Sequence, residues 1–340
     1  MDVREDVPLA PHTSLELGGP AKRFAEVTDE RAILPLLERA REQQLRVVFL
    51  GGGSNLIVPD EGWPGLVIAI RSRGIETAPR GDEMNVTAAA GEPWDALVAR
   101  TVAADLAGLE CLSGIPGLVG ATPIQNVGAY GQEVSETIAA VRALDRRTGE
   151  LVVLTPADCA FAYRDSALKR DPDRFVVLSV SFALRPGGAP TVRYAELERA
   201  LAGPPRDLRT VRETVLALRR AKSMVIDPDD ANRRSAGSFF TNPIVDASTA
   251  DALSLAHEGM PRWAHADGRV KLAAGWLIER AGITKGMRRG AVGISTKHAL
   301  ALVHHGGGTT SELLALADEV RAAVRARFGV ELEREPVLWT

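Results

Sequence analysis

The sequence contains few of the residues that mark several common protein classes. It has two cysteines among its 340 residues. Cys111 and Cys159 form no CxxC pair, so we expect reduced thiols rather than a disulfide. The six histidines are scattered. His304 and His305 are adjacent and would point apart on regular structure, so no metal site is expected.

The sequence also lacks a basic excess and a long apolar run. A net charge of −3 argues against nucleic acid as a partner, because no surplus of lysine and arginine exists to neutralise phosphates. No segment approaches the roughly 18 apolar residues of a membrane span. The acidic start MDVREDVPLAPH has no apolar segment of the kind that a signal peptide carries. We therefore expect a cytoplasmic protein, a monomer or weak dimer, that acts on small molecules without a membrane partner.

What the sequence does contain is a glycine-rich stretch, LSGIPGLVGATPIQNVGAYG, from Leu112 to Gly131. Its glycines and prolines disfavour both helix and strand. Such a main chain can instead lie close to a large polar ligand, and free N–H groups in successive turns make a concave anion site. The alternative is a long irregular loop, which is uncommon in compact domains.

A second glycine cluster, Gly51 to Asn55, directly follows the short apolar run RVVFL. A glycine-rich turn that leaves a buried strand is a usual place to hold a diphosphate through backbone donors. GGGSNL matches neither a P-loop nor the GxGxxG of a dinucleotide fold, and alone it is typical of a plain turn. Two such clusters in one chain indicate a ligand of dinucleotide size.

Length and patterning favour two main domains, with a ligand at their junction. Apolar content of 45% and charged content of 25% are those of an ordinary soluble protein. In the first region the pattern predicts helices and strands at 31–44, 46–50, 66–70, 84–90, 93–106 and 175–184. The linker-like segments are GGAP at 187–190 and AGPPRD at 202–207. Beyond them we expect helices at 210–221, 247–256, 271–281 and 311–328, and a short strand at 331–339.

Seven motifs, in order along the chain, resemble the UDP-N-acetylenolpyruvoylglucosamine reductases, the MurB flavoenzymes of peptidoglycan synthesis. They are HTSLELGGPA at 12–21, LGGGSNLIV at 50–58, GLECLSGIPGLVGATPIQNVGAYGQEV at 108–134, YRDSALK at 163–169, SAGSFFTNP at 235–243, VKLAAGWLIERAG at 270–282 and LEREPV at 332–337. The resemblance implies a mixed α/β (α+β) fold. An FAD-binding PCMH-type, MurB-like domain would span 18–187, with a small α/β N-terminal lobe at 1–70. A smaller α+β substrate-binding domain of the MurB type would follow at 205–337.

The resemblance also implies an oxidoreductase that reduces UDP-N-acetylenolpyruvoylglucosamine to UDP-N-acetylmuramate, with non-covalent FAD as cofactor and NADPH as co-substrate. This step supplies a peptidoglycan precursor, on which cell wall biogenesis, cell shape and cell division depend. Hydride requires a redox cofactor, because no side chain supplies it. The charge that develops at the substrate carboxylate requires preorganised polar groups, and protonation requires a positioned acid. A shared cleft for both substrates predicts ping-pong kinetics, with hydride transfer from flavin N5.

Two residues match the positions at which the family carries its catalytic arginine and its proton donor. Arg164, in YRDS, has the planar guanidinium that suits a developing carboxylate charge. Ser238, in GSFF, would donate the proton, and it needs a cationic environment that Lys222 and the nearby Arg219 can supply. Without the resemblance, YRDS is typical of a surface turn with an ion pair, and GSFF of a strand edge.

A glutamate near the C-terminus matches the family's catalytic carboxylate. The family's usual wording is closer to LEPEV, whereas this chain has LEREPV. Glu335 aligns best, but Glu333 lies on the same face of a strand, so both glutamates are candidates.

The resemblance places FAD against the two glycine clusters. The residues implied as cofactor-binding are Gly51, Gly52, Gly53, Ser54, Asn55, Leu56, Ile115, Pro116, Gly117, Gly120, Ala121, Thr122, Gln125, Asn126, Gly128, Ala129, Tyr130 and Gly131. Those implied as substrate-binding are Tyr194, Lys222, Asn242, Trp263, Lys285 and His298.

Two of the implied substrate contacts depart from the better-known relatives. These carry glutamine where this chain has His298, and more often tyrosine where it has Trp263. Residues 243–270 retain the insertion that marks the branch with a substrate-capping loop. An indole can stack on uracil but offers no phenolic hydroxyl to a phosphate, so we expect a retained lid with an altered diphosphate contact.

Two other functions are consistent with parts of the sequence. One is an FAD-dependent oxidase of the same flavin-fold superfamily, often with covalent flavin, but no histidine lies near the GGGSN turn. The other is a non-catalytic flavin- or nucleotide-binding module, against which the presence of Arg164, Ser238 and Glu335 argues.

Overall fold

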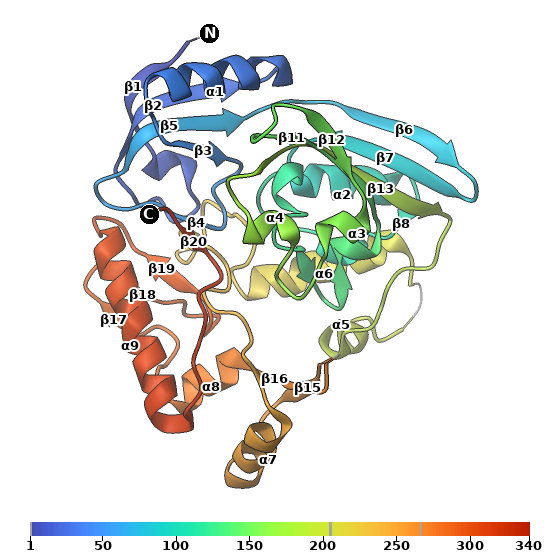
Figure 1. Cartoon of the computed structure of the whole chain (residues 1–340). Helices are drawn as coiled ribbons and strands as arrows, with labels where there is room; N and C mark the ends of the chain where they lie inside the picture. The colour runs from blue at the N-terminus through green and yellow to red at the C-terminus, as the bar shows by residue number, and fades with distance from the viewer. Residues whose placement is uncertain (1, 204–205, 266) are drawn as a thin grey trace. The chain divides into compact units, whose positions relative to one another are not determined.

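The computed structural model describes residues 2–203, 206–265 and 267–340, and the chain divides into two compact units whose elements are labelled in Figure 1. Unit 1 comprises the chain up to Val7, Ala21–Gly53 and Pro64–Ile226. Unit 2 comprises Pro8–Pro20, Ser54–Trp63 and the chain from Asp227 onward. Helices and strands are mixed in both units, as the sequence predicted, and each unit has its own core.

The observed division differs from the predicted one, which began the second domain at residue 205. Helix α6 (Leu208–Ala221) belongs to unit 1, because its Val211 and Val215 pack in one buried cluster with Cys111 and Leu197. The predicted linker at 202–207 therefore connects two parts of unit 1, and its residues 204–205 lie outside the described residues.

Two early segments of the chain belong to unit 2 instead of the predicted first domain. Leu15 from the first and Ile57 from the second are buried in the same core cluster as Phe239. Apolar contacts between residues far apart in sequence thus decide the membership of these segments, and local patterning does not show them.

The first sheet of unit 1 has the strand order β1-β2-β5-β3. Its strands are β1 (Arg4–Pro8), β2 (Pro20–Val27), β3 (Val47–Leu50) and β5 (Trp63–Ile70). Strands β3 and β5 are parallel, with Leu50 opposite Ala69. Helix α1 (Ile33–Glu42) buries Ile33, Leu36 and Ala40, which are spaced along one helical face. These side chains pack in one core cluster with β5.

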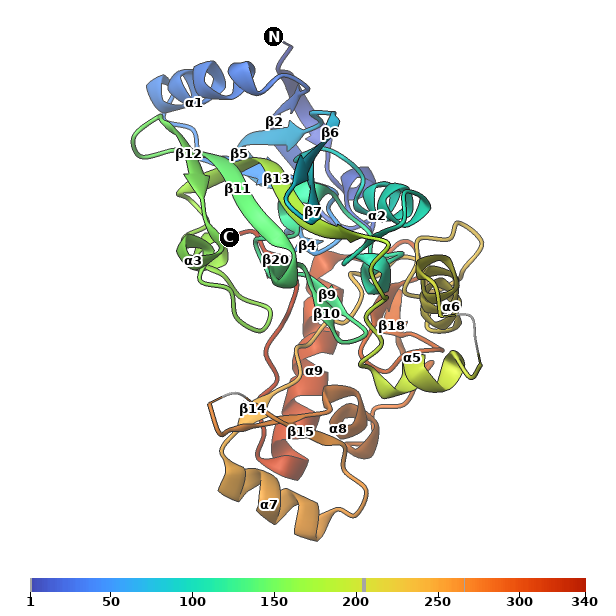
Figure 2. The same cartoon turned by 90° about the vertical axis from the view of Figure 1, so that its right-hand side faces the viewer.

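The second sheet of unit 1 is antiparallel and has the order β12-β11-β13-β7-β6, with β8 paired to β13. Its strands are β6 (Ile75–Arg80), β7 (Glu83–Ala89), β8 (Leu106–Ala107), β11 (Ile138–Asp145), β12 (Leu151–Leu154) and β13 (Phe175–Pro186). Helix α2 (Trp94–Ala103) packs on this sheet, as both views show (Figures 1 and 2), with the Trp94 and Phe182 rings 5.8 Å apart. The core cluster of unit 1 includes buried residues of both sheets.

The remaining elements of unit 1 are short, apart from α6. They are β9 (Gly128–Ala129), β10 (Gln132–Glu133), α3 (Pro156–Cys159), α4 (Ala167–Arg170) and α5 (Ala195–Ala200). The rest of the glycine-rich stretch contains only 3-10 turns and loops, in agreement with its composition.

Unit 2 is built from short strands and three helices in its described residues. The strands are β4 (Leu56–Ile57), β14 (Ile244–Val245), β15 (Arg262–Ala264), β16 (Val270–Leu272), β17 (Arg288–Arg289), β18 (Val292–Ile294), β19 (Leu302–His304) and β20 (Val337–Leu338). They form the sheets β14-β16-β15 and β17-β18-β19 and the parallel pair β20-β4. The helices are α7 (Ala247–Ala256), α8 (Ala274–Arg280) and α9 (Thr310–Phe328).

Helix α9 packs against β18 and β19 (Figure 1) and buries Leu313, Leu316 and Val320. It begins with a capping box of Thr309 and Glu312, so its start is fixed by local hydrogen bonds. The strand predicted at 331–339 is shorter than expected, because only β20 forms a regular pair there. No helix within the described ranges is long and apolar enough to cross a membrane.

Candidate functional site

The two glycine clusters meet in unit 1. A Cβ added to Gly52 would lie 2.7 Å from the Cα of Gly117, closer than real Cβ atoms come to backbone. A Cβ added to Gly120 would likewise lie 2.6 Å from the Cβ and 3.1 Å from the Cα of Ala90. The glycines therefore allow one backbone to lie directly against another. This contact explains why position 52 is glycine, and we call the touching main chain of the two clusters the cradle.

A partly buried ion pair holds the start of the glycine-rich stretch. The Asp95 carboxylate accepts the N–H of Gly114 at 2.6 Å and both Nη atoms of Arg212 at 2.6 and 2.8 Å. Burial alone would raise the pKa of Asp95, but the hydrogen bonds from Arg212 and Gly114 outweigh it and lower the pKa. Helix α6 is thus tied to the stretch by a charged contact that the sequence analysis did not find.

Two residues predicted to bind FAD have side chains that stabilise the stretch itself. Thr122 is buried and donates its hydroxyl to the carbonyl of Val119 at 2.8 Å. Asn126 is buried and donates its amide to Glu133 at 2.7 Å and to the Ala162 carbonyl at 3.0 Å. These side-chain bonds stabilise the stretch, and contact of either residue with FAD stays a prediction.

The other predicted residues of the stretch lie around the β9–β10 hairpin and the loops before it. Ala121 and Gly131 are exposed. Those that are partly buried are Ile115, Pro116, Gly117, Gly120, Gln125, Gly128, Ala129 and Tyr130. Tyr130 has a φ of 49° and Asn126 one of 44°, a left-handed conformation that is uncommon outside glycine.

Arg164 lies against this hairpin. Its guanidinium donates to the Gly128 carbonyl at 2.6 Å and to the Asn126 carbonyl at 3.4 Å. Its own φ of 54° is left-handed, a strain that clusters at functional sites. The neighbouring Ser166 donates its hydroxyl to the Ile124 carbonyl at 2.5 Å. The YRDS segment is therefore fixed on the glycine-rich stretch, and the structure brings Arg164 and the predicted FAD-binding backbone together.

A second group of predicted residues surrounds Tyr130. The ring of Tyr194 meets the ring of Tyr130 edge-on at 5.6 Å. Lys222 Nζ lies 5.8 Å from the Tyr130 ring and is paired with Glu196 at 2.5 Å. Burial raises the pKa of Tyr130 to about 12 and also raises that of Tyr194. Both phenols are therefore neutral hydrogen-bond donors at physiological pH.

Arg219 adds a cation that the sequence analysis named only as a neighbour of Lys222. Its Nη2 donates to the Met224 carbonyl at 2.6 Å, whereas its buried Nε makes no hydrogen bond with the described residues. Burial lowers the pKa of Arg219. A Cβ on Gly114 would lie 3.3 Å from that Nε, so Arg219 adjoins the glycine-rich stretch. The sequence signal was the basic end of an amphipathic helix.

In unit 2, three chain segments are hydrogen-bonded to one another around Glu335. Its N–H donates to the Phe239 carbonyl at 3.0 Å, and Asn55 Nδ2 donates to the Glu335 carbonyl at 3.4 Å. The N–H of Val337 donates to the Asn55 carbonyl at 3.0 Å. Ser238 directly precedes Phe239, so the predicted acid and carboxylate lie on adjacent hydrogen-bonded segments.

The two candidate glutamates differ in burial. Glu333 is exposed and contributes its carbonyl to the Thr241 N–H at 3.0 Å, whereas Glu335 is partly buried. A carboxylate that must act at a substrate has to be shielded from bulk water. The burial therefore favours Glu335.

The N-terminal motif supports the same region of unit 2. Ser14 donates its hydroxyl to the Ser235 carbonyl at 2.7 Å and lies 3.4 Å from the Ser54 carbonyl. Ser54, Asn55 and the buried Leu56 belong to unit 2, so the predicted diphosphate turn divides between the units after Gly53.

The remaining predicted substrate residues lie on separate loops and strands of unit 2. The side-chain Oδ1 of Asn242 accepts the N–H of Ala274, the first residue of α8, at 3.0 Å. Lys285 is exposed and 3.3 Å from Glu279, and His298 is partly buried in the loop before β19.

The predicted lid, 243–270, folds as α7 and the strands β14 and β15, with β16 completing the sheet. Trp263 lies on β15 opposite Lys271 and is 44% exposed. Lys271 Nζ lies 5.9 Å from its ring. Trp263 is thus a large exposed aromatic on a small sheet, and its role in substrate stacking stays a prediction. Residue 266 lies outside the described residues.

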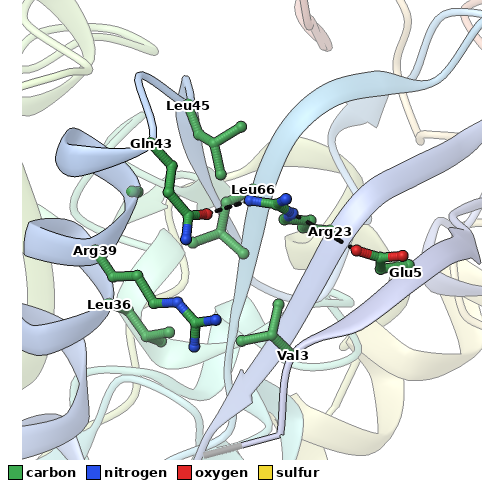
Figure 3. Close-up of a pocket in the computed structure, with 9 residues that line it drawn as sticks. Val3, Glu5, Arg23, Leu36, Arg39, Gln43, Leu45 and Leu66 are labelled. Carbon is green, nitrogen blue, oxygen red and sulfur yellow. Dashed lines mark hydrogen bonds and ion pairs between the residues drawn. The ribbon is translucent and has the colours of Figure 1, made fainter.

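A cavity of about 100 Å³ in unit 1 lies elsewhere. It opens between α1 and β1, and Figure 3 shows Arg23, Arg39 and Gln43 at it together with the apolar side chains of Leu36 and Leu66. None of the predicted site residues lines it.

Comparison with known proteins agrees with this geometry. Residues 21–155, which include both glycine clusters, match the family model of an FAD binding domain. Residues 227–339 match the model described as UDP-N-acetylenolpyruvoylglucosamine reductase, C-terminal domain. Fold and site thus define a flavoprotein with an FAD-binding PCMH-type domain.

Relatives along the whole chain identify the family. The UDP-N-acetylenolpyruvoylglucosamine reductase of Streptomyces coelicolor is 50% identical over 345 positions, which cover 98% of this chain and 89% of that protein. That of Saccharopolyspora erythraea is 51% identical over 345 positions, which cover 97% of this chain and 94% of that protein. The crystal structure of the Thermus caldophilus reductase covers 100% of both chains, with a TM-score of 0.67 and 26% identity. This chain belongs to the UDP-N-acetylenolpyruvoylglucosamine reductase family.

Proposed function

We propose that this protein uses NADPH and FAD to reduce UDP-N-acetylenolpyruvoylglucosamine to UDP-N-acetylmuramate, a step of peptidoglycan precursor synthesis. The observation that carries the proposal is the hydrogen bond between Glu335 and Phe239, next to Ser238. It holds a hydroxyl and a partly buried carboxylate on adjacent segments, as protonation of an enolic intermediate requires. Family membership supplies the substrate class.

The residues of the cradle would hold FAD through their backbone. Gly52 and Gly117 are in contact, and the N–H groups of such turns point at an anion. When bound, FAD supplies the hydride from its N5 that no side chain can supply. Asp95 and Thr122 would stabilise the stretch rather than touch the cofactor.

Arg164 would stabilise the negative charge that develops on the substrate carboxylate as hydride reaches the terminal alkene carbon. Its guanidinium is held by the carbonyls of Gly128 and Asn126. An arginine fixed before the reaction stabilises charge without reorganising during it. Lys222 and Arg219 would add to the positive potential of unit 1.

Ser238 would then donate its hydroxyl proton to the alpha carbon, and Glu335 would stabilise the enolic intermediate. The alkene gains one hydride and one proton, and NADPH is oxidised to NADP⁺. We propose a ping-pong order, in which NADP⁺ leaves before the UDP-sugar enters. We place the reaction in the cytoplasm, catalysed by a monomer or weak dimer without a nucleic-acid or membrane partner.

An anaerobic experiment separates the two half-reactions. The purified protein is loaded with FAD, reduced with NADPH, and mixed with UDP-N-acetylenolpyruvoylglucosamine while the flavin absorbance is followed. Rapid reoxidation without oxygen is expected. A flavin that stays reduced until air enters would favour an oxidase instead, and a protein that binds no FAD would refute the proposal.

A further inference from the structure

Arg71 follows strand β5, and its guanidinium reaches the glycine turn that follows the neighbouring strand β3. Its Nη1 donates to the Gly51 carbonyl at 3.0 Å and to the Ile70 carbonyl at 2.8 Å. Strands β3 and β5 are parallel neighbours. Both residues therefore lie at the carboxyl ends of adjacent parallel strands, where ligands of α/β sheets bind.

The backbone of Arg71 is fixed as well. Its N–H donates to the Val27 carbonyl at 2.7 Å, so the residue is held by β2 on its other side. The guanidinium is partly buried, and burial lowers the pKa of Arg71. Removing part of a cation from water costs free energy. The partial burial of this guanidinium against two carbonyls therefore indicates a role beyond surface charge.

The contact has a geometric consequence for the turn. In a planar trans peptide, the carbonyl of one residue and the N–H of the next point in opposite directions. A Gly51 carbonyl directed at Arg71 therefore turns the N–H of Gly52 away from Arg71. Within the described residues, that N–H makes no hydrogen bond. Gly53 follows with a φ of 64°, the left-handed conformation of an anion-binding turn.

We propose that Arg71 is a positioning residue for FAD: by holding the Gly51 carbonyl, it orients the Gly52 N–H as a donor to the cofactor diphosphate. The inference rests on the proposed role of the turn as a diphosphate site. Arg71 itself acts through the peptide and does not take part in the chemistry.

The test uses Arg71→Met, which removes the donors but keeps an apolar stem, and Arg71→Lys, which keeps the charge and one donor group. Arg39→Met is the matched control, because it removes one exposed arginine of the same unit at the cavity of Figure 3, away from the turn. Two quantities are measured on each full-length protein. They are the dissociation constant of FAD with the apoprotein, and the ³¹P resonances of FAD bound to the loaded protein.

We expect Arg71→Met to weaken FAD binding by about 10- to 100-fold, the effect of losing one hydrogen bond to a charged group. Arg71→Lys should lie between Arg71→Met and wild type. The ³¹P resonances should move in both variants, whereas Arg39→Met should match wild type in both measurements.

Wild-type FAD affinity in Arg71→Met would overturn the proposal. So would weaker binding with unmoved ³¹P resonances, which would indicate a general loss of stability. If Arg71→Met fails to fold, the resonances of Arg71→Lys decide alone. Failure of the proposed reaction is distinguishable, because it would appear in the wild-type half-reactions while FAD binding remained intact.

Discussion

Unit 1 and unit 2 carry their candidate residues in different ways. In unit 1, backbone lies on backbone: Gly52 meets Gly117, and side chains such as Asp95 and Asn126 hold the stretch in place. In unit 2, Ser238 and Glu335 are side chains on two segments joined by a single pair of antiparallel backbone hydrogen bonds. Binding a large cofactor needs many backbone donors, whereas protonation needs a few side chains at fixed positions. The two units should therefore respond differently to substitution.

The largest effect is expected in unit 2, from Ser238→Ala. Loss of the proton donor should slow substrate-dependent reoxidation of the flavin by about 10²- to 10⁴-fold, the usual contribution of a general acid. Reduction by NADPH should be nearly unchanged, because hydride transfer to flavin requires no proton from Ser238. Stopped-flow absorbance of each half-reaction measures both rates.

Ser235→Ala is the control for Ser238→Ala. Ser235 is a buried serine in the same segment, and its hydroxyl only accepts the N–H of Gly237 at 3.4 Å. Its removal should leave both half-reactions close to wild type. Equal losses of both half-reactions in Ser238→Ala would show that the serine is structural.

The next effect is expected from Glu335→Gln, which removes the carboxylate while keeping the size of the side chain. We expect turnover to fall by about 10²- to 10³-fold, as for loss of one group that stabilises developing charge. Glu333→Gln removes the same charge from an exposed position two residues away and should have little effect. Steady-state kcat of the two variants decides between them, and the reverse result would assign the role to Glu333.

A smaller effect, confined to unit 1, is expected from Gly52→Ala. Its Cβ would lie 2.7 Å from the Gly117 Cα, so the two clusters must move apart. Overpacking of this kind costs about 1–3 kcal/mol, and we expect weaker FAD binding and a lower Tm. Gly51→Ala is the control, because its nearest neighbour would be 4.0 Å away. FAD titration that finds the two variants equal would contradict the packing argument.

A smaller effect still is expected from a substitution in the predicted lid, residues 243–270. Trp263→Ala should raise KM for the UDP-sugar by roughly 2- to 10-fold, the value of one aromatic stacking contact, with little change in kcat. Leu255→Ala is the control, since Leu255 is 90% exposed on α7 of the same insertion. An unchanged KM in Trp263→Ala would remove the tryptophan from the substrate site.

The smallest effect concerns the pH dependence of stability in unit 1. Burial raises the pKa of Tyr130 to about 12, whereas the pKa of a tyrosine in the unfolded chain is about 10. The folded state therefore retains a proton that the unfolded state loses between these values. The stabilisation from the neutral phenol is fully present below pH about 10 and is lost as the pH rises toward 12. In urea unfolding over this range, Tyr130→Phe should show a shallower fall in the free energy of unfolding, and equal slopes would disprove this assignment.

Elements with a strong local signal were predicted well. The helices expected at 247–256, 210–221 and 311–328 are α7, α6 and α9, within a few residues. The strands expected at 84–90 and 175–184 are β7 and β13. In α6 and α9 the apolar periodicity matches the face that each buries, so local and tertiary preferences agree there.

Other elements were not predicted from sequence. Strands β2 and β11 have irregular burial patterns rather than clean alternation. Pairing with β13 stabilises β11, and two register irregularities interrupt that pairing. The strand expected at 331–339 is reduced to β20, because the segment before it pairs with 239–241 through one isolated bridge, Phe240 to Arg334. In each case a partner distant in sequence sets the length of the strand.

For the candidate site, the sequence by itself indicated where the backbone is free to approach a ligand or another backbone closely. Glycine is the only residue without a Cβ, so the clusters at 51–53 and 112–131 mark that property directly. Only the tertiary structure decided that Gly52 lies on Gly117, that Asn126 is buried in support, and that Glu335 is more shielded than Glu333. It also decided that α6 belongs with the first unit and that Arg71 reaches Gly51. The reason is physical: close approach is a property of one residue, whereas burial, pairing and charge compensation are properties of two residues that the sequence keeps far apart.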